Sequence, residues 1–272
     1  GVFLSGAAPI QVNFLGYPGT SGSKCMDYIV ADKTLISVDE EKYYSEKIIY
    51  LPDTYQPNEE NKEILDNNLS REKNGLPENQ FVFCCFNSHQ KINPKMFLVW
   101  TKILKQKKDS VLWLLKDNKF SEKNLKNALS DQGLDPKRLI FADHVPLDQH
   151  LARLKLADLL LDTYPYNAHT SCSDALRMNL PVVTLKGRSF ASRVATSLIN
   201  TLSVDELVTI NFDEYEKLAI KISNDKSYLA EIKDKIKANK KNSNLFNTSV
   251  YTKNIEEAYK IIYNKYFNKE PK

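Results

Sequence analysis

Between residues 81 and 185 the chain alternates short apolar runs with longer amphipathic segments. The apolar runs are continuous, which is typical of parallel strands buried on both faces of a sheet. These runs predict strands at residues 81–87, 110–116, 138–143, 159–163 and 181–185.

The amphipathic segments predict helices at residues 94–106, 121–133, 146–158 and 171–178. In the first helix one face gathers the large apolar side chains, namely Phe97, Trp100, Ile103 and Leu104. Ser121 is the expected cap of the second helix, Gly133 its end, and Pro146 lies in the first turn of the third. Repeated β-α units of this length predict an α/β, Rossmann-like domain with a parallel sheet.

The flanks of this region differ from it in pattern. Residues 53–80 are polar and rich in turn formers, so they are the best candidate for a linker or domain boundary. No repeat of 34 residues, the period of tetratricopeptide arrays, is present. The flanking elements predicted are a strand at 46–52 and helices at 189–202, 212–223, 226–240 and 251–267.

Composition narrows the class of protein. The 272 residues are 42% hydrophobic and carry a net charge of +4, with much of the basic excess at 231–242. We interpret that basic stretch as a solvated helix face, with nucleic-acid binding a minor alternative. No apolar run approaches the roughly 20 residues that span a bilayer. The four cysteines form neither a CxxC pair nor a disulfide framework, which favours the reducing cytoplasm.

The opening residues 1–20 lack a methionine and are already apolar, without the basic start of a signal peptide. We therefore expect the chain to begin inside a domain.

Candidate chemistry lies where predicted strands end, because open parallel sheets bind ligands outside the carboxyl ends of their strands. After the strand at 81–87 comes Lys91, which could place a positive charge on a phosphate. The alternative is an ordinary exposed loop lysine. His150 and Arg153 are three residues apart, so they share one helix face and could contact a base or a pyrophosphate. The alternative is a polar face turned to solvent.

The stretch TYPYNAHTSCSDAL, residues 163–176, places polar side chains between a predicted strand and the helix that follows it. His169, Thr170 and Ser171 begin that helix, and helix N-termini bind anions through free N–H groups and the helix dipole. Asp174 could accept hydrogen bonds from ribose hydroxyls. A capping box would explain Ser171 and Asp174, but it leaves the nearby Tyr166 without a role.

Other nucleotide and metal chemistries find little support. The chain has no GxGxxG and no Walker motif, which disfavours classical dehydrogenases and P-loop NTPases. The four histidines fall in no metal-ligand spacing, and no DxD pair follows a predicted strand.

Several long blocks carry a resemblance to a known family. They are APIQVNFLGYPGTSGSKCMDYIVAD, YYSEKIIYLPDTYQPN, FVFCCFNSHQKINP, LADLLLDTYPYNAHTSCSDAL, ASRVATSL and LFNTSVYT. In this order they resemble the catalytic region of O-linked N-acetylglucosamine transferases, nearest the bacterial SPINDLY-like members of glycosyltransferase family 41. The resemblance covers essentially the whole chain.

The resemblance implies a GT-B fold, in which two Rossmann-like lobes face each other and the C-terminal lobe holds most of the nucleotide sugar. It implies an inverting, metal-independent enzyme without a cofactor, which transfers N-acetylglucosamine from UDP-GlcNAc to serine or threonine hydroxyls of proteins. The implied divisions are the end of the N-terminal lobe (1–60), a linker (61–80), the nucleotide-sugar lobe (81–245) and a C-terminal helix packing back on the N-terminal lobe (246–272). An upstream lobe and tetratricopeptide repeats are implied partners, with no nucleic acid or membrane.

The resemblance also implies roles for individual residues. Lys91 matches the family lysine on the diphosphate that is needed for activity. The matches at the nucleotide are the backbone of Val145 and the side chains of His150, Arg153, His169, Thr170, Ser171 and Asp174. The matches in the sugar pocket are Leu15, Gly16, Pro18, Tyr55 and Tyr166.

Some features depart from the family pattern and leave alternatives open. The block SDALRMNLP places Arg177 and Asn179 where SDALWAGLP is more common. GDP-fucose or UDP-glucose as donor, and a truncated, non-catalytic UDP-sugar-binding module, remain alternative functions.

Overall fold

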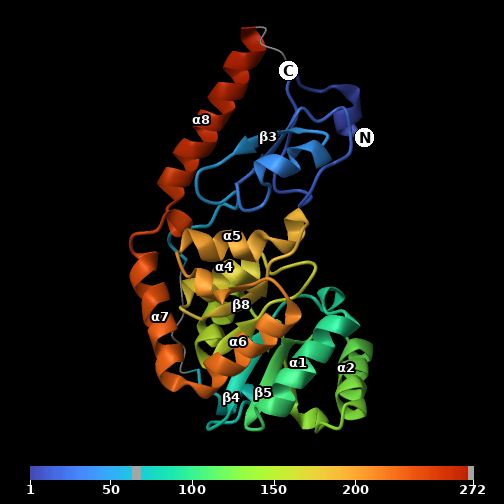
Figure 1. Ribbon diagram of the computed structural model, residues 1–272, viewed down its shortest axis with the longest axis vertical. Coiled ribbons are helices and arrows are strands. Elements are labelled where there is room, and N and C mark those ends of the chain that lie inside the picture. Colours follow the sequence, from blue (N-terminus) through green and yellow to red (C-terminus); the bar gives the residue numbers. More distant parts are fainter. Residues whose placement is uncertain (63–68, 269–272) are drawn as a thin grey trace.

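The computed structural model describes residues 1–62 and 69–268. The predicted linker 61–80 and C-terminal segment 246–272 therefore lie partly outside the described residues. The described part forms two units stacked along the long axis of the molecule, with the chain's two ends at the same extremity (Figure 1). No helix in it is both long and apolar enough to cross a membrane.

The N-terminal unit contains a small parallel sheet in the order β1-β2-β3. Its strands are β1 (Val12–Asn13), β2 (Tyr28–Ala31) and β3 (Lys47–Tyr50). The sequence pattern predicted only the third. The two-residue β1 is defined by pairing with its neighbour, whereas β2 is as long as β3 and was missed.

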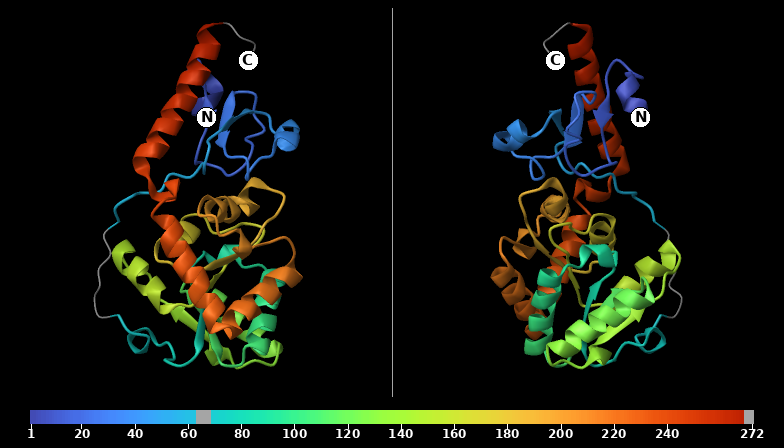
Figure 2. Two further views of the ribbon diagram at one scale, coloured as in Figure 1. Left: turned by 60° about the vertical axis from the view of Figure 1, so that its left-hand side comes forward. Right: turned by 90° about the vertical axis from the view of Figure 1, so that its right-hand side faces the viewer.

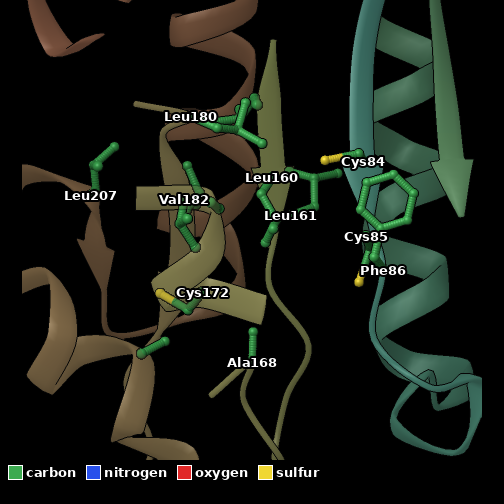
Figure 3. Close-up of a cluster of buried hydrophobic side chains, with 14 of the residues drawn as sticks. Cys84, Cys85, Phe86, Leu160, Leu161, Ala168, Cys172, Leu180, Val182 and Leu207 are labelled. Atoms are coloured by element: carbon green, nitrogen blue, oxygen red, sulfur yellow. The ribbon is translucent and has the colours of Figure 1, made fainter. Parts of the chain in front are cut away.

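The C-terminal unit is built on a larger parallel sheet in the order β6-β5-β4-β7-β8-β9. The strands are β4 (Phe81–Cys85), β5 (Ser110–Leu115), β6 (Leu139–Ala142), β7 (Leu159–Leu161), β8 (Val182–Leu185) and β9 (Val208–Thr209). The predicted parallel sheet is confirmed, and only the two-residue β9 was missed. Figure 3 shows the sheet's core, where Cys84, Leu160 and Val182 lie on neighbouring strands.

All but the last of the helices flank this sheet (Figures 1 and 2). The helices are α1 (Pro94–Gln106), α2 (Lys119–Asp131), α3 (Leu147–Arg153), α4 (Thr170–Arg177), α5 (Val194–Thr201), α6 (Phe212–Asn224), α7 (Lys226–Lys240) and α8 (Thr248–Phe267). The predicted apolar face of α1 is confirmed, since Phe97, Trp100, Ile103 and Leu104 are all buried.

Several helix boundaries differ from prediction, among them the start of α8, which lies at Thr248 and not at residue 251. Helix α2 begins earlier, because the side chain of Asn118 accepts hydrogen bonds from the N–H groups of Phe120 and Ser121 and is the cap in place of Ser121. Helix α3 ends at Arg153 and continues as a 3₁₀ turn. The helix predicted at 189–202 is interrupted at Arg193, whose side chain is used in a contact between the two units.

The last helix, α8, lies beside the N-terminal unit (Figure 2). Ala258 of α8 belongs to an apolar cluster with Val30 and Leu51. The hydroxyl of Tyr251 donates a hydrogen bond of 2.8 Å to the carbonyl of Tyr55. The chain therefore returns to its N-terminal unit after completing the larger sheet.

Candidate functional site

The sheet order reverses between β4 and β7, where the chain has built outward to β6 and then returns to build on the other side. Ligands in open parallel sheets bind at such a switch point, beyond the carboxyl ends of the strands. Lys91 follows β4 and the segment 162–169 follows β7, so both reach this point.

Lys91 lies at the centre of the site. Its Nζ donates a hydrogen bond of 2.9 Å to the carbonyl oxygen of Asn167 and lies 4.1 Å from the ring centroid of Tyr166. Burial lowers the pKa of the ammonium, and the nearby carboxylate of Asp162 opposes that shift. The half-buried position excludes the alternative of an ordinary exposed loop lysine.

Asp162 organises the loop that Lys91 contacts. Its Oδ1 accepts hydrogen bonds from the N–H groups of Thr163 (2.7 Å) and Ala168 (2.6 Å), and its Oδ2 accepts one from the hydroxyl of Thr184 (2.6 Å). Burial raises the pKa of Asp162 to about 7, against these hydrogen bonds and Lys91. Sequence reasoning gave this residue no role, although an aspartate at the end of an apolar strand was a usable signal.

Helix α4 begins at the same place. His169 is its N-cap residue and makes no side-chain capping hydrogen bond. Thr170 is exposed and Ser171 half-buried, so the start of the helix, where the first backbone N–H groups lack helical acceptors, lies at an accessible surface. The capping-box alternative fails, because Asp174 pairs with Lys62, the two atoms Oδ1 and Nζ being 3.0 Å apart.

His169 is held neutral in this position. Its ring stacks on Tyr166 with centroids 4.9 Å apart. Burial, and next the charge of Lys91, lower the pKa of His169 to about 4. A neutral imidazole beside the helix start can donate or accept a hydrogen bond without adding charge.

The second arm of the site comes from α3. The guanidinium of Arg153 donates to Nδ1 of His150, at 3.1 Å from Nε and 2.8 Å from Nη2, and lies 4.7 Å from the ring centroid of Phe86. Arg153 is only 4% exposed, so the alternative of a solvent-facing polar face fails for it. Burial and Arg153 lower the pKa of His150 to about 4. Val145 lies exposed on the loop before this helix.

The predicted sugar-pocket residues come from both units. Leu15 and Gly16 are exposed in the loop between β1 and β2, with Pro18 half-buried beside them. Tyr55 is buried with its ring edge-on to Phe190, at a centroid distance of 4.9 Å.

Tyr166 relates these residues to the phosphate side of the site. Burial raises the pKa of Tyr55, and the nearby Tyr166 raises it further. Burial also raises the pKa of Tyr166, with a smaller contribution from Tyr17, the residue before Pro18. Tyr17, in the loop that holds the predicted sugar wall, therefore lies near Tyr166.

The sequence of this chain resembles those of known proteins. The chain matches the model of glycosyl transferase family 41 over residues 1–65 and 56–255. It is 34% identical over 264 residues to the probable UDP-N-acetylglucosamine–peptide N-acetylglucosaminyltransferase SEC of Arabidopsis thaliana, covering 95% of this chain and 27% of SEC. It is 36% identical over 197 residues to the UDP-N-acetylglucosamine–peptide N-acetylglucosaminyltransferase of Caenorhabditis elegans, covering 72% of this chain and 17% of that protein. The chain thus spans about a quarter or less of these relatives.

Among solved structures, a mutant of the Thermobaculum terrenum O-GlcNAc transferase superposes with a TM-score of 0.87 at 28% identity, over 97% of this chain and half (50%) of that one. The glycosyltransferase WaaG shares the fold, with a TM-score of 0.60 at 15% identity over 84% of this chain and 62% of that one. These likenesses confirm the predicted GT-B fold. The matches over nearly the whole length establish that the chain belongs to glycosyl transferase family 41.

Proposed function

We propose that this chain is the donor-binding part of a protein O-GlcNAc transferase, which moves N-acetylglucosamine from UDP-GlcNAc to serine or threonine hydroxyls with inversion at the anomeric carbon. The observation that carries the proposal is the hydrogen bond of Lys91 to the loop that leads into α4, close to the N-cap residue His169, at the switch point of the sheet. The names of the relatives support a UDP-GlcNAc donor and a peptide acceptor.

The chemistry requires stabilisation of a leaving group. As the acceptor oxygen bonds to the anomeric carbon, the bond to UDP breaks and negative charge grows on the β-phosphate. The ammonium of Lys91 and the N–H groups of Thr170 and Ser171 would receive that charge, and fixed donors of this kind need no rearrangement as the charge develops. We therefore propose that transfer proceeds without a metal ion.

The partners and location belong to the same proposal. The relatives are much longer than this chain, which supports an upstream catalytic lobe acting with it. Tetratricopeptide repeats, the identity of the acceptor proteins and a cytoplasmic location stay predictions, as does the absence of nucleic-acid and membrane partners.

Calorimetric titration with UDP tests the donor site. We expect Lys91→Ala to weaken UDP binding about tenfold or more, because a charge-assisted contact to a phosphate contributes about 1.5–3 kcal/mol. Lys95→Ala is the matched control, since Lys95 is an exposed lysine four residues further along, and its loss should change binding less than about twofold.

Nucleotide titrations together with transfer assays separate the alternatives. Tighter binding of GDP than of UDP would support a GDP-fucose donor, and equal transfer from UDP-glucose would broaden the donor class. UDP binding without transfer to any peptide, even with the upstream lobe supplied, would support the non-catalytic module. No measurable UDP binding, or no effect of Lys91→Ala, would contradict the proposed donor site.

A further inference from the structure

The polar segment that follows the N-terminal unit, from Asn58 to Lys62, contacts α4 through its side chains. Oδ1 of Asn58 accepts a hydrogen bond of 2.5 Å from the hydroxyl of Ser173. Four residues later, Nζ of Lys62 lies 3.0 Å from Oδ1 of Asp174. The side chains of this ion pair are 15% and 5% exposed, so the pair is largely shielded from water.

Arg177 fixes the backbone immediately before Lys62. Its guanidinium donates hydrogen bonds to the carbonyl oxygens of Glu59 and Glu60, the second at 3.0 Å. It also lies 4.2 Å from the ring centroid of Phe246, which supports it from the other side. Arg177, which departs from the common family block, therefore anchors the backbone two and three residues before Lys62.

Asn179, which also departs from that block, lies at the same end of α4. Its backbone has a φ of 58°, a left-handed conformation that asparagine tolerates better than most residues. Its Oδ1 accepts a hydrogen bond of 2.6 Å from Nζ of Lys240. Lys240 also donates to the carbonyl of Arg177. Lys240 of α7 thus holds the C-terminal end of α4 in place through Arg177 and Asn179.

The charge of Lys62 matters for an anionic ligand. Asp174 lies one turn into the helix whose first N–H groups form the proposed phosphate site, and an unpaired carboxylate there would repel a diphosphate. Burial makes that repulsion stronger than it would be in water. Lys62 also lies near enough to His150 to contribute to lowering its pKa, so its charge extends from α4 to α3.

We propose that Lys62 is a further residue of the donor site, whose ammonium neutralises Asp174 and so removes the repulsion that this carboxylate would exert on the diphosphate of the nucleotide sugar. The proposal rests on the proposed function and adds to it a residue from the segment between the units. In this arrangement two parts of α4 have different roles. The start of the helix binds phosphate, and the Asp174–Lys62 ion pair, which has no net charge, contacts the ribose.

UDP and uridine titrations of the full chain test this role, because the two ligands differ only in the diphosphate. We expect Lys62→Met to weaken UDP binding about tenfold while changing the affinity for uridine, measured by competition, less than about threefold. Lys62→Arg should keep UDP binding within about threefold of wild type, since it retains the charge. Lys241→Met is the matched control, because Lys241 is exposed and lines the same cavity as Lys62.

Each result has a defined reading, provided that urea unfolding finds the variants folded. Equal UDP affinity in wild type and Lys62→Met would overturn the proposed role of Lys62 and would leave the proposed function standing. A parallel loss of UDP and uridine affinity would also overturn it, because it would show a structural effect without a charge component. A wild-type chain that fails to bind UDP would overturn the proposed function and this proposal together.

Discussion

At the scale of single residues, the hydrogen bond between Arg153 and His150 fixes a protonation state. Arg153 is a donor only, so Nδ1 of His150 must be the acceptor and the ring must carry its proton on Nε2. A protonated imidazole would place an N–H group against the guanidinium. This geometry agrees with the lowering of the pKa of His150 from 6.5 to about 4.

The consequence is a loss of stability in mild acid. Between about pH 4 and 6.5 the unfolded chain binds more protons at His150 than the folded chain does, so stability is full above this window and falls as the pH drops through it. From pH 7 to pH 5 the loss from this residue is at most about 2 kcal/mol. His169 contributes in the same direction.

Urea unfolding at pH 7 and pH 5 measures this loss. His150→Asn, which keeps an acceptor near the Nδ1 position but does not titrate, should lose less stability than wild type over this interval. His144→Asn, an exposed histidine on the preceding loop, should behave as wild type does. The same loss in wild type and His150→Asn would contradict the explanation.

The residues of the site differ in how far sequence could predict them. Lys91, His150 and His169 follow predicted strands or share a predicted helix face, so local pattern and the geometry of parallel sheets place them together. Lys62 lies 112 residues from its partner Asp174 in a stretch that reads only as polar. That pairing depends on where a connecting segment runs, and local pattern carries no information about it.

At the scale of elements, strand length determined what the pattern could predict. Strands β4 to β8 lie within continuous apolar runs, and their type follows from burial on both faces. Strands β1 and β9 have two residues each, too few for any periodicity. They exist because a neighbouring strand offers hydrogen bonds, which is a tertiary effect.

Helix α8 provides a test at this scale, because two adjacent residues differ in burial. Ile262 is 2% exposed and Ile261 is 49% exposed. Ile262→Ala should lower the free energy of unfolding by about 2–4 kcal/mol, since it leaves a cavity in a packed site. Ile261→Ala should cost less than about 1 kcal/mol, as for other surface positions.

Amide hydrogen exchange locates the effect. In Ile262→Ala the amides of β2 and β3 should exchange faster than those of β4 to β8, because α8 packs on the smaller sheet. Similar costs for the two substitutions, or equal acceleration in both sheets, would show that α8 does not specifically support the N-terminal unit.

At the scale of the whole molecule, the start of α5 joins the two units. Arg193 donates from both terminal nitrogens to the carboxylate of Glu40, and from one of them also to the carbonyl of Leu35 (3.2 Å). Ser197 donates a hydrogen bond of 2.7 Å to Oδ2 of the buried Asp32. The arginine holds the pKa of Glu40 at about 2, well below its usual value. These contacts hold the N-terminal unit, which carries the predicted sugar wall, against the start of α5.

Removing this joint should affect the sugar more than the nucleotide. The predicted UDP contacts lie on the C-terminal unit and on Lys62, whereas Leu15, Gly16 and Pro18 lie on the N-terminal unit. We expect Arg193→Met to lower the ratio of UDP-GlcNAc affinity to UDP affinity about fivefold or more, because a misplaced wall loses contacts that only the sugar makes. Arg188→Met, which removes an exposed arginine five residues earlier, should leave that ratio unchanged.

Calorimetry with both ligands measures the ratio directly. An equal loss of both affinities in Arg193→Met would mean that the joint supports the nucleotide site itself, and wild-type affinity for both ligands would mean that the sugar is held by the C-terminal unit alone.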